Sequence, residues 1–118
     1  SMQLTVTQQA DSIIAAPVGR IDHASADSFL SALQDILVAC GTGSPPVVID
    51  CSGVDYIASV GLRALKIASV KAKDQGCRIG VAALQPLVQE VFNIACFNRV
   101  IACFDTVESA ARELSACK

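Results

Sequence analysis

The spacing of apolar residues changes along the chain, and each change marks a boundary between predicted strands and helices. Leu4 and Val6 alternate with polar residues, which is typical of an edge strand with one face in water. Phe29, Leu33 and Leu37 recur instead at the spacing of a helix with one buried face. The sequence predicts strands at 3–8, 12–18, 47–51, 77–84 and 100–104, and helices at 24–40, 59–75, from 86 and from 107.

Turn and cap residues set the limits of these elements. Ser25 is predicted to cap the first helix and Thr106 the last, because their hydroxyls can accept a hydrogen bond from a free backbone N–H. Residues 41–46 form the clearest loop, 52–58 a turn, and Gly76 the left-handed end of the second helix. The order β-β-α-β-α-β-α-β-α predicts one sheet with parallel neighbours and right-handed crossovers.

Composition and charge narrow the class of protein. The chain has 118 residues, of which 53% are hydrophobic and 4% aromatic, so a single aliphatic core is expected. The net charge of −2 provides no basic field for nucleic acid or acidic lipid. Apolar runs are too short to span a membrane, and no secretory signal opens the chain. We therefore expect a cytoplasmic protein with one domain over residues 3–118, and interpret residues 1–2 as an expression scar and an initiator Met.

Six cysteines raise the question of disulfides or a metal site, and their spacing argues against both. No Cys-x-x-Cys occurs, and the single histidine, His23, is distant in sequence from every cysteine. Most of the cysteines lie in aliphatic runs such as residues 100–104, where a free thiol acts as a small apolar group. We therefore expect reduced, buried thiols, as in the cytosol, and neither a metal nor another cofactor.

The sequence offers little for catalysis. His23 stands alone near a helix start, where a histidine is most often solvated. The phosphate-binding patterns Gly-x-x-x-x-Gly-Lys-Ser and Gly-x-Gly-x-x-Gly are absent. A small α/β enzyme or ligand carrier would need a polar pocket, and no cluster of His, Cys or acidic residues in the sequence would line one. We therefore expect a protein that binds another protein, and not an enzyme.

Ser59 stands at the end of a predicted turn and at the start of the second helix, and this position allows two interpretations. The first is an N-cap. The second is a phosphoacceptor, because a helix N-terminus favours added negative charge by about 0.3–1 kcal/mol. Phosphate could then be added without unfolding the domain. Position alone favours the cap.

Three segments resemble the signature of the STAS family, the anti-sigma-factor antagonists. The central family motif is commonly written Asp-Leu-Ser-Gly-Val-x-x-Ile-Asp-Ser-(Ser/Thr/Ala)-Gly-Leu, and residues 50–62 read Asp-Cys-Ser-Gly-Val-Asp-Tyr-Ile-Ala-Ser-Val-Gly-Leu. Residues 19–26 are similar to the family's Gly-(Glu/Arg)-(Leu/Ile)-Asp segment, and residues 84–92 to its x-Pro-x-Val-x-x-x-Phe helix. The three segments follow the family's order and together cover most of the chain.

The resemblance implies a function in partner switching. Unphosphorylated members bind an anti-sigma factor of the switch-kinase type, which frees a sigma factor for RNA polymerase. The kinase phosphorylates one serine, the antagonist is released, and a serine phosphatase resets it. That serine aligns with Ser59. The family usually has Asp before it, and this chain has Ala58, which implies weaker docking or phosphotransfer, or a divergent partner.

Neighbouring residues are candidates for the same partner-binding surface. Val60 and Gly61 follow Ser59 within the motif, and Val60 replaces a small polar residue. Asp22 follows the second strand, where the family's docking surface lies beside the serine loop. It can equally cap the first helix.

Three further candidates flank Ser59. Asp55 and Tyr56 are expected to be exposed in the preceding turn, although Tyr56 can equally anchor that turn to the core. Arg63, one turn beyond Ser59, can pair with a phosphate or an acidic partner, whereas a solvated helix charge is the commoner role.

The resulting expectation is an α/β, STAS-like single domain with a four- to five-stranded mixed sheet and helices packed mainly on one face. Its expected function is that of an anti-sigma-factor antagonist switched at Ser59, with a serine kinase and a serine phosphatase as partners. No nucleic-acid or direct membrane binding is expected. The alternative is a non-switching STAS subunit of a larger assembly, such as a lipid-transport ATPase or a stress-signalling complex. The edge strand at 3–8 could also pair with a copy of itself in a weak homodimer.

Overall fold

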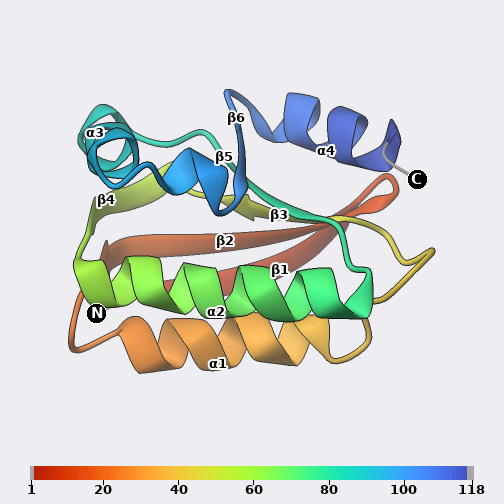
Figure 1. Cartoon of the computed structure of the whole chain (residues 1–118), viewed down its shortest axis with the longest axis horizontal. Helices are drawn as coiled ribbons and strands as arrows, with labels where there is room; N and C mark the ends of the chain where they lie inside the picture. The colour runs from red at the N-terminus through yellow and green to blue at the C-terminus, as the bar shows by residue number, and fades with distance from the viewer. Residues whose placement is uncertain (1, 117–118) are drawn as a thin grey trace.

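The computed structural model describes residues 2–116 as a mixed sheet with helices on both faces (Figure 1). The elements in chain order are β1 (Gln3–Gln9), β2 (Ser12–Ile21), α1 (Ala26–Leu37), β3 (Val47–Asp50), β4 (Gly53–Ile57), α2 (Ser59–Gln75), β5 (Ile79–Ala82), α3 (Pro86–Ile94), the 3₁₀ turn η1 (Phe97–Arg99), β6 (Ala102–Phe104) and α4 (Val107–Ala116). The predicted α/β class is confirmed. The predicted second helix has the bounds of α2, and Gly76 ends it with a left-handed φ of 75°.

The sheet is organised around β2. This strand pairs antiparallel with β1, and its other edge pairs in parallel first with β3 and then with β4. β5 and β6 continue the sheet beyond β3. The sheet therefore has six strands, and the expectation of four or five was wrong, because β4 lies within the segment 52–58 that reads as a turn.

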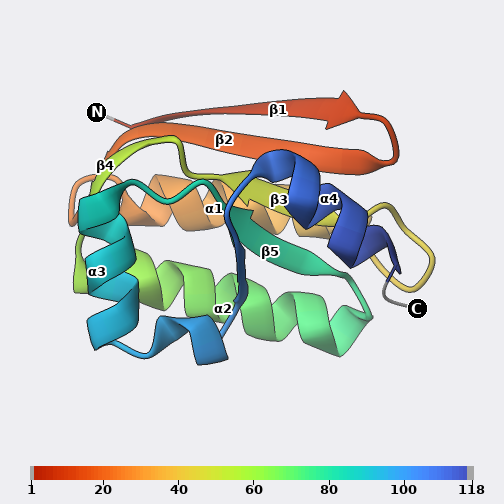
Figure 2. The same ribbon diagram turned by 90° about the horizontal axis from the view of Figure 1, so that it is seen from above.

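Two apolar layers stabilise the sheet. The larger layer is formed with α1, α2 and α3, and Phe29, Leu65 and Phe92 are among its fully buried side chains. α4 covers the opposite face and packs Ala110 and Leu114 on that side. The prediction that helices lie mainly on one face is confirmed, and α4 is the exception (Figures 1 and 2). Within residues 2–116, no helix is both long enough and apolar enough to cross a membrane.

The prediction of reduced cysteines was wrong for one pair. α1 and α2 run side by side in the same direction, so their C-terminal ends meet (Figure 1). There, Cys40 and Cys77 form a disulfide with Cα atoms 5.4 Å apart, although 37 positions separate them in the sequence. The side-chain amide of Gln75 also donates hydrogen bonds to the carbonyl oxygens of Leu37 and Cys40, at 2.7 and 2.8 Å. The ends of both helices are thus joined covalently and by hydrogen bonds.

The other described cysteines are free thiols. Cys51 is buried, Cys103 is half-buried and Cys96 is exposed. Burial raises the pKa of the Cys51 thiol to about 12, so this side chain stays protonated and acts as an apolar group. Cys117 lies outside the described residues.

The disulfide predicts a stability that depends on the redox conditions. Closing a loop between residues 37 positions apart restricts the unfolded chain, which is expected to contribute about 3–4 kcal/mol. We expect the free energy of unfolding in urea to fall by about this amount when a dithiol reductant is added. A Cys40→Ala variant serves as the control, because it should be less stable and should not respond to the reductant. Equal stability of the wild-type protein with and without reductant would contradict this expectation.

Candidate functional site

The candidate site is formed where β2 and β4 end next to each other. The backbone N–H of Ala58, just after β4, donates a hydrogen bond of 2.8 Å to the carbonyl oxygen of Ile21, the last residue of β2. The loop that begins at Asp22 and the start of α2 at Ser59 are therefore held side by side. Sequence-distant segments meet here because β2 and β4 are parallel neighbours.

A β-bulge orients two side chains at this end of the sheet. Gly19 pairs with Val54 and Arg20 with Tyr56, so Asp55 is an extra, unpaired residue in β4. Gly19 has a φ of 109°, a backbone conformation that favours glycine. The shift places the Arg20 guanidinium 4.4 Å from the centre of the Tyr56 ring, a cation–π contact of about 0.5–1 kcal/mol at an exposed site. Tyr56 is therefore held by Arg20, while Asp55 is exposed as expected.

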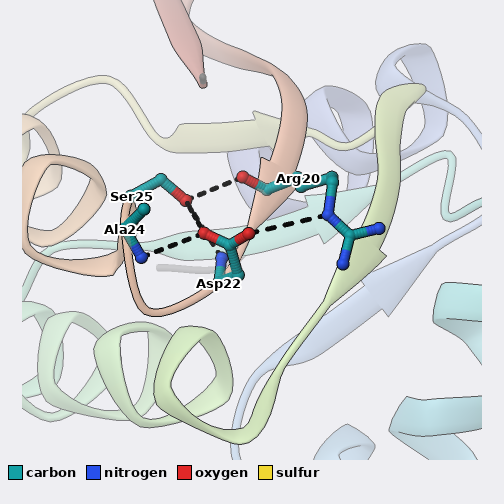
Figure 3. Close-up of polar contacts among 4 residues, drawn as sticks. All are labelled: Arg20, Asp22, Ala24 and Ser25. Atoms are coloured by element: carbon teal, nitrogen blue, oxygen red, sulfur yellow. Dashed lines mark hydrogen bonds and ion pairs between the residues drawn. The ribbon is translucent and has the colours of Figure 1, made fainter.

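The loop after β2 is ordered by a small polar network, shown in Figure 3. The Ser25 hydroxyl lies 2.7 Å from the Arg20 carbonyl oxygen, to which it donates, and accepts from the backbone N–H of Asp22 at 3.0 Å. Asp22 Oδ1 accepts the backbone N–H of Ala24 at 3.0 Å, and Asp22 Oδ2 lies 3.6 Å from Nε of Arg20. This network fixes the backbone from Arg20 to Ser25.

The carboxyl group of Asp22 is partly exposed to solvent, and the network favours its charged form. Partial desolvation alone would raise the pKa of its carboxyl group, but it is outweighed by the hydrogen bond from the Ala24 N–H, by the Ser25 hydroxyl 3.3 Å from Asp22 Oδ1, which shares its proton with the Arg20 carbonyl, and by the nearby Arg20. The pKa of Asp22 is therefore lowered from its usual value of 3.8. The carboxylate is ionised at neutral pH and gives this loop a fixed negative charge.

The prediction that Ser25 caps α1 through its side chain was wrong. Ser25 occupies the N-cap position, but its hydroxyl makes no capping bond to the helix. Because this side chain is buried and turned toward Arg20 and Asp22, it stabilises the loop instead. Asp22 contributes to the start of the helix through its carbonyl oxygen, which accepts the N–H groups of Ser25 and Ala26.

Ser59 is the first residue of α2, and Ala58 occupies the N-cap position. No side-chain hydrogen bond caps this helix, and the Ser59 hydroxyl makes no hydrogen bond with any residue in the range 2–116. The interpretation of Ser59 as an N-cap is therefore wrong. The side chain is exposed beside the Asp22 loop, and its hydroxyl is available to a partner.

Of the residues that follow Ser59, some pack against the sheet and others are exposed on the surface. A Cβ atom on Gly61 would lie 2.7 Å from Cγ2 of Ile21 and 2.7 Å from Cγ1 of Ile57, so glycine lets α2 rest on the ends of both strands. Gly61 is buried and influences the surface through the position of the helix. Val60 is half-buried, and Arg63 is exposed one turn beyond Ser59. Arg63 also begins a shallow groove along the outer face of α2 that includes the exposed Ile67 and Val70.

The structure thus brings the predicted residues Asp22, Tyr56, Ala58 and Ser59 to one end of the sheet. Sequence reasoning missed Arg20, whose side chain contacts both Asp22 and Tyr56. Its signal in the sequence is the Gly-Arg-Ile-Asp segment, a motif that assigns no role to the arginine. His23 is exposed in the same loop. Across residues 2–116, no group of three or more His, Cys, Asp or Glu side chains could hold a metal ion.

Comparisons with known proteins agree with this architecture. A protein of Bordetella bronchiseptica named BtrV, a proposed anti-sigma factor antagonist, is 27% identical over 93% of this chain and 92% of its own. The crystal structure of an anti-sigma factor antagonist from Mycobacterium paratuberculosis matches with a TM-score of 0.85 and 23% identity, covering 98% of this chain and 95% of that one. The murine anion transporter Slc26a9 matches with a TM-score of 0.70 and 20% identity over 93% of this chain, but only 18% of its own.

The fold and the site together define a small mixed α/β domain with a loop-and-helix surface at one end of its sheet. The model of the STAS domain matches residues 3–110. The chain therefore belongs to the STAS domain family.

The geometry predicts different roles for two serine or threonine residues at helix starts. Ser59→Ala should change the free energy of unfolding by less than about 0.5 kcal/mol, because the hydroxyl caps nothing. Thr106→Ala should cost about 1 kcal/mol, since Thr106 Oγ1 accepts the backbone N–H of Ser109 at 3.0 Å and caps α4. Urea unfolding of both variants under the same conditions tests this difference. A loss of about 1 kcal/mol or more in Ser59→Ala would restore the cap interpretation.

Proposed function

We propose that this protein is an anti-sigma-factor antagonist. In its unphosphorylated form it binds an anti-sigma factor that is also a serine kinase, and this binding frees a sigma factor. Phosphorylation of Ser59 ends the interaction, and a serine phosphatase restores it. Membership of the STAS family and the names of the matching proteins support the antagonist role.

The observation that carries the switching proposal is the state of Ser59. Its hydroxyl is exposed, makes no hydrogen bond within residues 2–116 and stands at the first residue of a 17-residue helix. A kinase can therefore reach it without breaking an existing contact. The neighbouring loop is already ordered by Asp22 and Ser25, so a partner meets a preformed surface.

The proposed switch is a phosphoryl transfer, which adds negative charge to this surface. The Ser59 oxygen attacks the γ-phosphorus of ATP bound to the kinase, the bond to the ADP oxygen breaks, and the hydroxyl proton passes to a base of the kinase. The product carries about −1.5 to −2 charges, which the N-terminus of α2 favours by roughly 0.3–1 kcal/mol. The fold therefore tolerates the phosphate. A partner docked on this surface would meet like-charge repulsion, and the phosphate would lose its hydrating water. A penalty of about 3 kcal/mol lowers affinity roughly a hundredfold.

The residues around Ser59 give this surface both signs of charge. Asp22 and the exposed Asp55 are acidic, while Arg20 and Arg63 are basic. We propose that Asp22, Asp55, Tyr56, Ala58, Val60 and Arg63 contact the partner and that Gly61 sets the height of the helix. Because Ala58 supplies no carboxylate, docking on this side depends on the Asp22 loop.

A non-switching role is the second candidate. Ala58 stands where the family usually has Asp, and the STAS fold also forms 18% of the chain of a murine anion transporter. In this alternative the same surface would bind a larger assembly constitutively, and Ser59 would remain unmodified.

A pull-down from native cell lysate separates these candidates. We expect the wild-type protein to recover a kinase-like ATPase that the Ser59→Asp variant loses, because the added charge mimics the phosphate. Ser52→Asp is the matched control, since it adds the same charge at another exposed serine, at the opposite end of β4. Bound proteins are identified by mass spectrometry. The recovered ATPase and ATP should then add one phosphate to the wild-type protein and none to Ser59→Ala, as measured by intact mass.

Two outcomes would contradict the switching proposal. The first is equal recovery of a transporter or scaffold by the wild-type and Ser59→Asp proteins. The second is the absence of phosphate on Ser59 after incubation with the recovered ATPase and ATP.

A further inference from the structure

The outer edge of β1 is the longest strand edge that the described part of the protein leaves unpaired. β1 has seven residues, and within residues 2–116 it pairs with β2 along one edge and with no strand along the other. Figure 2 shows it along one border of the molecule. At the opposite border, β6 has three residues. In an antiparallel ladder, alternate residues of an edge strand direct their N–H and C=O groups away from the sheet.

β1 lacks the features that usually prevent edge strands from pairing. Protected edges carry charged side chains, prolines or bulges, and β1, with the sequence Gln-Leu-Thr-Val-Thr-Gln-Gln, contains no charge and no proline. Its pairing with β2 is continuous over all seven residues, so no bulge twists the edge away. The nearest charged residue in the sequence, Asp11, lies beyond the strand in the turn to β2.

The central residues of β1 suit antiparallel pairing with a second copy of the strand. If two copies of β1 lie antiparallel with Val6 at the centre, each of the seven residues in one copy has a partner in the other. Val6 then faces Val6 of the second copy, and Thr5 faces its Thr7. Threonine pairs and β-branched apolar pairs across strands contribute about 0.2–1 kcal/mol each. No like charges meet, because the strand carries none.

An apolar hollow continues this edge on the helix side of the sheet. It is lined by Val6 and Gln8 of β1 and extends to Ile13, Ile36 and Ala39. Val6 is 52% exposed, so an aliphatic side chain at the centre of the edge remains in water in the single chain. A second Val6 brought beside it by strand pairing would cover part of this apolar surface.

We propose that two copies of this chain associate by antiparallel pairing of their β1 strands, with the two-fold axis at Val6. The result is one continuous sheet across both copies, with an isologous interface. Strand pairing over seven residues is a small interface, so the association is reversible and depends on concentration. The interface contains none of the residues assigned to the Ser59 surface, and it does not depend on the proposed function.

Sedimentation equilibrium over micromolar to millimolar concentrations tests this dimer. We expect the mean mass of the wild-type protein to rise from that of one chain toward that of two. Val6→Lys should remain a single chain, because two lysines would face each other at the axis. Ile94→Lys is the matched control, since Ile94 is 85% exposed at the end of α3, and this variant should associate like the wild type.

Hydrogen exchange provides a second measurement on the wild-type protein and does not rely on a variant that folds. Amides of alternate β1 residues should exchange more slowly at high than at low concentration, and those of α3 should not change. A wild-type mass of one chain at every concentration would overturn the proposal and leave the edge open to another protein. The proposal would also be overturned if both lysine variants lost association equally, or if neither variant lost it.

Discussion

β2 pairs with three strands, and the position of every other element near the site follows from this pairing. Seven of its ten residues, 12–18, pair with β1 along one edge, while the other edge pairs with β3 through residues 13–15 and with β4 through residues 18–21. Because β4 continues alongside the end of β2, the hydrogen bond from Ala58 to Ile21 holds the start of α2 beside the loop that follows β2. Gly61 then allows α2 to rest on these strand ends. A surface made of the Asp22 loop and the start of α2 is thereby held by backbone contacts.

Local patterns in the sequence predicted the elements that depend on local contacts. Gly76 predicted the end of α2, and the predicted turn at 52–58 placed Ser59 at its start. β4 could not be recognised in this way, because Gly53 and Asp55 favour a turn and the strand is held by its distant partner β2. The disulfide was missed for a similar reason, since the parallel packing of α1 and α2 brings together cysteines that sequence spacing keeps apart. The Ser25 hydroxyl could bond either a backbone N–H in the first turn of α1 or groups of the preceding loop. In the structure it bonds the loop, at Arg20 and Asp22, and does not cap the helix.

The proposed switch acts on a surface that exists before the phosphate is added. The Asp22 loop is ordered by its own hydrogen bonds, and the Arg20–Tyr56 contact fixes the adjacent strand end. At the N-terminus of α2, a phosphate on Ser59 would meet backbone N–H groups, with Arg63 one turn away. The fold can accept this charge, and the partner cannot approach it without a desolvation cost. In the proposed switch, partner release follows from a local change in charge and requires no rearrangement of the core.

The most direct test of this account is a comparison of the ¹H–¹⁵N correlation spectra of the unmodified protein and of the protein with phosphoserine incorporated at position 59. We expect chemical shifts to change in the Asp22–Ser25 loop, at the end of β4 and in the first turn of α2, and signals of β3, β5 and α4 to stay in place. Widespread shifts in the core strands, or loss of the α2 signals, would show that the phosphate acts by changing the fold and would contradict the account.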